Sequence, residues 1–124
     1  MDDYNRREGK TESGGITTIA LDVLHTIARL TTLSVAGVSR LAPTPIGVNR
    51  LFKGRLSEGV QMEIQDDVVF ADLYIVMKKE VNIREVSRNI HREVARAISE
   101  MVGMQVGNVN IHVEDIDYPT ETEA

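Results

Sequence analysis

The stretch NIREVSRNIHREVARAISEMVG, residues 82–103, decides the fold that we predict for this chain. Its apolar residues recur every three or four positions, which is the spacing of one face of an α-helix. Asn82 can cap the first turn through its side-chain oxygen, and Glu85 can reach back to the Asn82 amide, as in a capping box. Gly103 supplies the left-handed residue that commonly follows the last helical turn. The sequence therefore predicts a helix over this stretch.

The opposite face of this predicted helix is basic. It carries an arginine at every fourth position, a set that we name the arginine row: Arg84, Arg88, Arg92 and Arg96. Like charges four residues apart repel each other in a helix, at about 0.2–0.5 kcal/mol per pair. Two interpretations stay open. The row is either a solvated face, as charge rows usually are, or a docking surface for an anionic partner.

Three stretches of alternating apolar residues predict strands around this helix. They are residues 59–65, 68–77 and 109–113, and Asp66-Asp67 predicts a hairpin turn between the first two. The strand at 68–77 is apolar on one face and partly apolar on the other. We therefore expect it either to lie in the centre of a sheet or to meet another subunit, and the second possibility predicts self-association.

The N-terminal half predicts one more strand and one more helix. Residues 16–19 are all β-branched, and residues 20–36 carry apolar side chains at helical spacing, closed by Gly37. The resulting order is β-α-β-β-α-β. We therefore predict an α+β domain in which two helices cover one face of a four-stranded sheet. The strand order stays open, and both a ferredoxin-like and a KH-like arrangement fit the pattern.

The ordered part of the chain is predicted to be a single domain at residues 14–118. Residues 1–13 mix charges without apolar periodicity, so we expect a disordered N-terminal arm there. Residues 119–124 are expected to form an acidic disordered tail. The three segments together account for the whole chain.

The least regular part of the predicted domain is residues 38–58, where two prolines and two glycines interrupt any continuous element. We expect an irregular loop here, and loops of this length are often functional. Four of its residues are candidate partner contacts beside the arginine row: Arg50, Phe52, Lys53 and Arg55.

Composition excludes several functional classes. The chain of 124 residues has no cysteine, which excludes disulfides, thiolate metal sites and cysteine nucleophiles and suits a reducing cytoplasm. No leading apolar run resembles a signal peptide, and no apolar stretch is long enough to span a bilayer. We therefore expect a cytoplasmic protein that reaches a membrane only through a partner. The net charge of −5 equals the charge of five C-terminal acidic residues: Glu114, Asp115, Asp117, Glu121 and Glu123.

The motifs that carry catalysis or cofactor binding are missing from the sequence. His25, His91 and His112 have no second ligand at a metal-binding spacing, so we interpret them as surface residues and expect neither metal nor cofactor. There is no phosphate-binding glycine loop and no nucleophile elbow. The G-x-x-G loop of KH domains is missing, and the aromatic residues are too scattered for base stacking. The sequence therefore predicts a protein that is not an enzyme.

The pattern from residue 15 to residue 113 resembles the bacterial alkaline shock protein family, also called envelope stress response proteins. The resemblance is carried by GGITTIALDVLHTIARLTTLSVAGV, by GVQMEIQDDVVFADLYIVM, by the predicted helix at 82–103 and by VGNVNIHVEDI. The chain departs from the family at Ala20-Leu21, where Ser-Pro is common, and at Lys79-Glu80, where Tyr-Gly is common. These departures affect a helix cap and a turn.

The resemblance implies a non-enzymatic cytoplasmic protein of the envelope stress response or of cell-envelope homeostasis. It further implies self-association and recruitment to the membrane by a small membrane-anchored protein, and it brings no catalytic residue to this chain. The alternative is a nucleic-acid-binding module that uses the arginine row with Arg50, Lys53 and Arg55. The acidic overall charge argues against a general nucleic-acid binder, while the arginine row keeps this alternative open.

Overall fold

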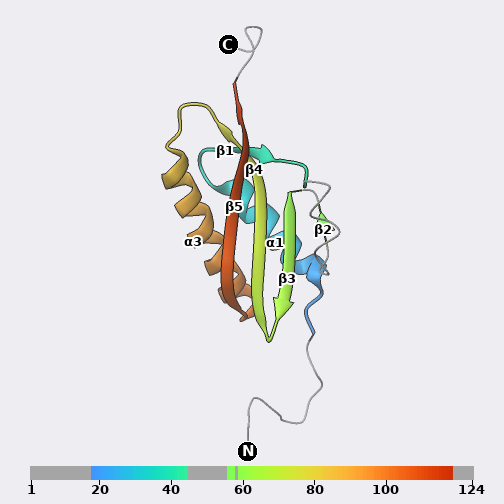
Figure 1. Ribbon diagram of the computed structural model, residues 1–124. Coiled ribbons are helices and arrows are strands. Elements are labelled where there is room, and N and C mark those ends of the chain that lie inside the picture. Colours follow the sequence, from blue (N-terminus) through green and yellow to red (C-terminus); the bar gives the residue numbers. More distant parts are fainter. Residues whose placement is uncertain (1–17, 45–55, 58, 119–124) are drawn as a thin grey trace, which may run out of the picture.

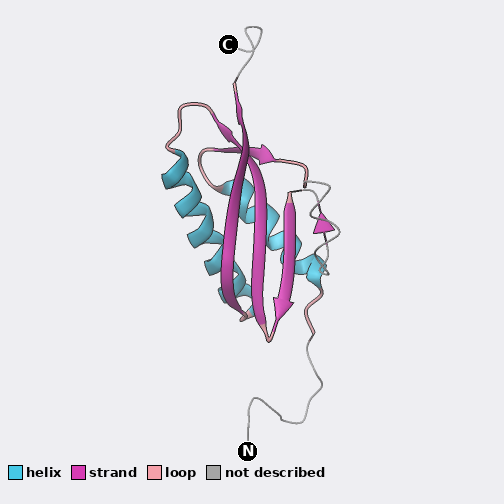
Figure 2. Cartoon of the chain, in the orientation of Figure 1, coloured by secondary structure: helices cyan, strands magenta, loops and turns pink. Residues whose placement is uncertain are grey.

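A computed structural model describes residues 18–44, 56–57 and 59–118, with residues 56 and 57 described by their backbone alone. Within these ranges the chain forms two helices and five strands. Their order is α1 (Leu21–Ser34), β1 (Val38–Leu41), β2 (Leu56–Ser57), β3 (Val60–Gln65), β4 (Val68–Lys78), α3 (Ile83–Val102) and β5 (Gln105–Asp117). Both helices lie on the same face of one sheet (Figure 1, Figure 2), which confirms the predicted α+β class.

Strand β4 is the centre of the sheet. On one side it pairs antiparallel with β3 as far as Leu73, and β1 continues along the same side opposite Ile75 and Met77. On its other side β4 pairs with β5 along its whole length, and this pair is parallel. The two-residue β2 extends the sheet beyond β3. The central position explains why β4 is apolar on both faces, one of the two explanations that its sequence left open.

The strand predicted at residues 16–19 is not found where the structure describes it, because Thr18 and Ile19 lie outside any strand. Residues 16 and 17 fall outside the described part. The strand β1 forms instead within the segment that we predicted to be an irregular loop. The difference arises from strand pairing, because a segment with high strand propensity forms a strand only where it can pair with a free edge of another strand. Strand β3 leaves the end of β4 uncovered, and β1 takes that edge.

The predicted hairpin and long helix are confirmed. Asp66 and Asp67 both have positive φ, 52° and 66°, as a tight primed turn between antiparallel strands requires. The Asn82 side chain accepts a hydrogen bond of 3.0 Å from the Glu85 amide at the start of α3. Gly103 ends the helix in the left-handed region, with φ 73° and ψ 18°. Strand β5 is longer than predicted, because its pairing with β4 extends it in both directions.

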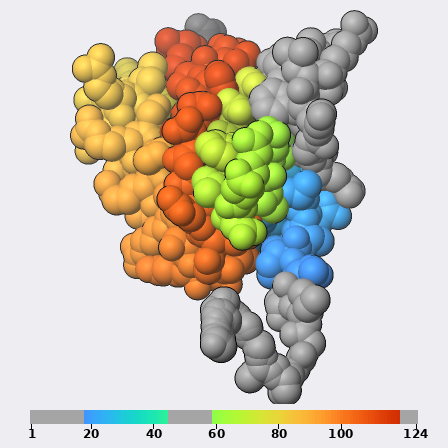
Figure 3. All heavy atoms as spheres, turned by 60° about the horizontal axis from the view of Figure 1, so that its bottom comes forward, coloured from blue at the N-terminus to red at the C-terminus, as the bar shows by residue number. Residues whose placement is uncertain are grey.

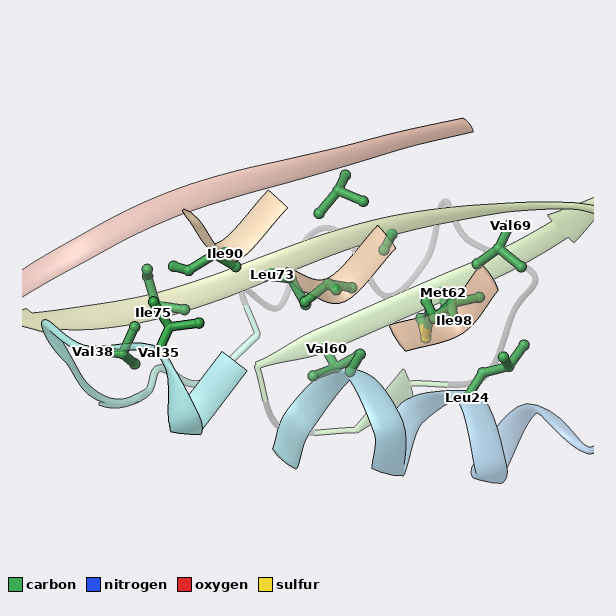
Figure 4. Packing of buried hydrophobic residues seen from close by; sticks show 14 of the residues in the cluster. Leu24, Val35, Val38, Val60, Met62, Val69, Leu73, Ile75, Ile90 and Ile98 are labelled. Carbon is green, nitrogen blue, oxygen red and sulfur yellow. The ribbon is translucent and has the colours of Figure 1, made fainter. Parts of the chain in front are cut away.

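The hydrophobic core fills the layer between the sheet and the two helices (Figure 4). Leu24 of α1, Ile90 and Ile98 of α3, and Leu73 and Ile75 of β4 are all fully buried. Burying each such side chain contributes about 1.5–3 kcal/mol relative to leaving it in water. Because β4 contributes to this layer along most of its length, the core fixes the position of α3 and of everything that α3 displays.

Helix α1, unlike α3, does not separate its apolar and polar side chains cleanly into a buried face and an exposed face. Its inward face includes two polar residues, His25 and Thr32, which are buried beside Leu24 and Ala28. This corrects the interpretation of His25 as a surface residue. The structure turns larger apolar side chains outward instead, since Val23, Leu30 and Leu33 are 46%, 56% and 40% exposed. The apolar spacing in residues 20–36 therefore belongs to two faces of the helix.

Candidate interaction surface

Helix α3 displays the arginine row toward solvent. The helix buries Val86, Ile90, Val94 and Ile98 against the sheet, and all four arginines lie on the exposed side. At 1.5 Å per residue the row extends for about 18 Å along the helix. The structure therefore brings these four predicted site residues together on one continuous surface.

The C-terminal half of the row is accompanied by carboxylates. Arg96 Nε lies 3.4 Å from Glu100 Oε2, and Arg96 Nη1 lies 3.9 Å from Glu93 Oε1. Arg92 Nε lies 3.6 Å from the other oxygen of Glu93, and Arg92 also donates a hydrogen bond of 2.8 Å to Asn89. These pairs are solvent-exposed, so each stabilises the helix by less than about 1 kcal/mol. Their main effect is to neutralise this half of the row.

The N-terminal half of the row keeps its positive charge. Across the described residues, neither Arg84 nor Arg88 has a carboxylate within ion-pair distance. Both lie in the first two turns of α3, where the helix dipole adds a partial positive charge. The most electropositive part of α3 is therefore its N-terminal half, and its chemistry suits a carboxylate or phosphate on a partner.

The other predicted contact residues lie outside the described part of the chain. These are Arg50, Phe52, Lys53 and Arg55. That these residues form one surface together with the arginine row stays a prediction.

A second cluster lies on the face of the sheet opposite the helices. His112 Nε2 on β5 lies 2.9 Å from Asp72 Oδ1 on β4. The imidazole stacks on the ring of Tyr74, with centroids 4.5 Å apart and planes 12° apart. Burial raises the pKa of Tyr74 above its ordinary value of 10.0, with smaller contributions from the charges of Asp72 and Glu114. These contacts tie β5 to β4.

Sequence reasoning missed this cluster. We interpreted His112 as a surface residue, and its side chain is 41% exposed, but the sequence did not indicate that it pairs with a carboxylate. Only the parallel register places His112 opposite Tyr74, and it does so across a separation of 38 positions in sequence (112 − 74). The one sign of this cluster in the sequence was a charged residue, Asp72, inside a strand that is otherwise mostly apolar. His91, in contrast, is exposed as interpreted.

Described residues of both helices line hollows in the surface. One of about 340 Å³ lies between α1 and α3 and is lined by Thr31, Glu93, Arg96, Ala97, Glu100 and Met101. Another of about 450 Å³ lies at the end of the molecule that Figure 3 brings forward. It is lined by Thr18, Ile19, Ile64, Asp67, Val102 and Met104. Neither set of lining residues includes a histidine or a nucleophile beside a base.

Neither a metal centre nor a membrane-spanning helix is found among the described residues. No cluster of three or more histidine and acidic side chains is arranged to hold a metal ion in the part of the chain that the structure describes. Neither α1 nor α3 is both long enough and apolar enough to cross a membrane.

Comparison with known proteins adds a family to these findings. The model of the alkaline shock protein 23 family, described as having a cell envelope-related function, matches residues 9–118. The uncharacterized protein Spy1535 of Streptococcus pyogenes serotype M6 is 34% identical over 107 residues, which cover 86% of this chain and 82% of that protein. The uncharacterized protein YqhY of Bacillus subtilis is 26% identical over 126 residues, covering 99% and 88%. Among solved structures, MamM-CTD is similar over 77% of this chain and 98% of its own, with a TM-score of 0.49 and 12% identity, a level that says nothing of function.

Proposed function

Because this chain belongs to the alkaline shock protein 23 family, whose function is cell envelope-related, we propose that it acts as a non-enzymatic interaction protein. Its role would lie in the bacterial envelope stress response or in cell-envelope homeostasis. In this proposal the protein is cytoplasmic, self-associates as a scaffold, and is recruited to the membrane by a small membrane-anchored protein. The family match supports the envelope setting, and the surface of α3 supports the mode of recruitment.

The observation that carries the proposal is the uncompensated N-terminal half of the arginine row. Arg84 and Arg88 are exposed, four positions apart, and without a carboxylate partner among the described residues. Like charges at this spacing weaken a helix, so the row does not serve the stability of α3. A guanidinium pairs with a carboxylate through two parallel hydrogen bonds. An acidic segment of a partner protein is therefore the ligand that this surface fits.

The contacts elsewhere support a binding role over catalysis. His112 is paired with the carboxylate of Asp72, and it stacks on Tyr74. A general base needs a reactive group within hydrogen-bond reach of the proton that it takes. His112 uses Nε2 for Asp72 and its ring face for Tyr74, so both serve the packing of β5 on β4.

The experiment is an affinity capture from the native cell with tagged full-length protein. The test variant is Arg84→Gln/Arg88→Gln. The matched control is Arg40→Gln/Lys78→Gln, which removes two exposed positive charges from β1 and β4 instead. Both captures are analysed for protein and for nucleic acid at low and at moderate salt.

We expect one small membrane protein to be captured by the wild type and by the control and to be lost from the test variant. Equal capture by all three proteins would contradict the role of the row. RNA or DNA in place of the membrane protein, released steeply as salt increases, would favour the nucleic-acid-binding alternative.

A further inference from the structure

The outward face of α1 carries an apolar stripe that nothing in the described structure covers. Val23, Leu30 and Leu33 are three of the six large apolar side chains that are exposed in the described residues. They project opposite the buried Leu24 and Ala28, so α1 presents apolar residues to the core and to solvent. A helix that is apolar on both faces is normally covered on both. Exposed apolar residues gathered on one face of a helix in this way indicate a contact surface.

Two opposite charges flank this stripe on the same side. Asp22 and Arg29 are both exposed and lie seven positions apart. Seven residues make nearly two full helical turns, so these side chains project from the same flank of α1, about 20° apart. The outward side of α1 therefore carries an apolar stripe with an acid near its start and a base about two turns further on, both on the same flank.

We propose that the outward face of α1 is a self-association surface and that its occupant is α1 of a second copy of this chain. The two helices pack antiparallel about a two-fold axis beside Thr26. Val23 and Leu30 lie at almost equal distances on either side of Thr26, and so do Asp22 and Arg29. An antiparallel two-fold contact therefore places Val23 against Leu30 of the second copy, and Asp22 against its Arg29, twice over. This inference rests on the self-association in the proposed function and assigns it a surface.

Charge complementarity selects this occupant and this direction. An acid and a base at equal distances from a centre complement the same surface turned by 180°. A parallel two-fold contact would carry the flank with Asp22 and Arg29 to opposite sides of the two helices, so neither charge would meet its complement, whereas the antiparallel contact keeps both flanks on the same side. The exposed Thr26 at the centre has a small side chain, which lets the two helices approach closely.

The experiment is sedimentation equilibrium on the full chain with a charge-exchange cycle. Its variants are Asp22→Arg, Arg29→Asp and Asp22→Arg/Arg29→Asp. Each single variant places two like-charge pairs in the contact, and we expect it to weaken the dimer about tenfold. The double variant restores both pairs with their signs exchanged, and we expect its dissociation constant to return to within about threefold of the wild-type value. Thermal unfolding of each variant controls for the lost acid in the first turn of α1.

Three further variants make the test independent of charge. Leu30→Gln removes a central apolar contact and should weaken the dimer, whereas Tyr118→Gln, at a side chain that is 66% exposed beyond β5, should not. The chain has no cysteine, so Thr26→Cys offers one thiol per copy and should form a disulfide-linked dimer under mild oxidation.

The outcomes separate this inference from the proposed function. A wild type that stays monomeric at high micromolar concentration would overturn self-association altogether, and this inference with it. A wild type that assembles while Leu30→Gln and the single exchanges leave assembly unchanged would overturn only the assignment to α1. Single exchanges that weaken the dimer without rescue in the double variant would overturn the antiparallel geometry.

Discussion

His112 Nε2 lies 2.9 Å from Asp72 Oδ1, although the two residues are 40 positions apart in sequence. The pair joins β5 to β4 on the face of the sheet opposite α1 and α3, and the imidazole also stacks on Tyr74. Parallel strands have no hairpin to fix their register. The cross-strand hydrogen bond and ring contact therefore help to set how β5 lies along β4.

Replacing His112 should weaken the fold through this pair. His112→Phe keeps an aromatic ring against Tyr74 but leaves the mostly buried Asp72 carboxylate without its hydrogen bond. We expect the free energy of unfolding to fall by about 1 kcal/mol, measured by urea denaturation. His91→Phe, on the exposed side of α3, should change it by less than about 0.5 kcal/mol. Equal effects of the two variants would show that the Asp72 contact adds nothing.

Tyr74 should make the protein less stable in strong alkali. Because its pKa is raised in the folded state, the unfolded chain loses the phenol proton first, from about pH 10 upward. The stability that the protonated Tyr74 contributes is fully present below that pH and is lost as pH rises through the folded-state pKa. Denaturant melts between pH 8 and pH 11 should show a smaller fall in stability for Tyr74→Phe than for the wild type. Tyr118→Phe, at an exposed position, should follow the wild type.

Gln61 is a polar side chain in an unfavourable place. It is 1% exposed, and neither its amide nitrogen nor its oxygen has a hydrogen-bond partner among the described residues. An unsatisfied buried amide costs about 1–3 kcal/mol, so Gln61→Met should raise the free energy of unfolding by about 1 kcal/mol. The exposed Gln65 offers a control, since Gln65→Met should be nearly neutral. A loss of stability in Gln61→Met would mean that this amide has a structural partner.

Gly37 and Gly103 allow a comparison of two left-handed glycines. Both have positive φ, 100° and 73°, and alanine at Gly103 would meet nothing within 4 Å. The free energy of unfolding of Gly103→Ala should therefore fall only by the cost of holding an alanine in the left-handed region, about 1 kcal/mol. A Cβ at Gly37 would lie 2.7 Å from Val86 Cγ2, in the core under α3. The free energy of unfolding of Gly37→Ala, measured by thermal or urea unfolding, should fall by about 2 kcal/mol or more. Equal falls for Gly37→Ala and Gly103→Ala would show that Val86 moves aside without cost.

The arginine row should be neutral for folding. Arg84→Gln/Arg88→Gln removes one like-charge pair four positions apart at the positive end of the helix dipole. We expect the free energy of unfolding to stay unchanged or to rise by up to about 0.5 kcal/mol in urea. A clear loss of stability would show that these side chains hold α3 in place, and a loss of partner capture could then be a consequence of unfolding.

Much of the fold could be predicted because its signals are local. The cap at Asn82, the turn at Asp66-Asp67 and the left-handed Gly103 each depend on a few neighbouring residues. The arginine row was predicted for the same reason, since a four-residue spacing fixes a helix face. Strand β1 could not be predicted this way, because it forms by taking a free edge of β4 from far along the chain.

The sequence by itself determined the α+β class, where α3 begins and ends in the chain, and the face of α3 on which the arginines lie. It did so because helix periodicity, caps and turns are read from residues within a few positions of one another. Only the tertiary structure decided the parallel pairing of β5 with β4, the contact between His112 and Asp72, and the burial of His25 and Thr32 in place of Leu30 and Leu33. Those outcomes depend on which edges and faces the packed sheet leaves free. A helix with apolar residues on two sides can bury only one of them within its own domain.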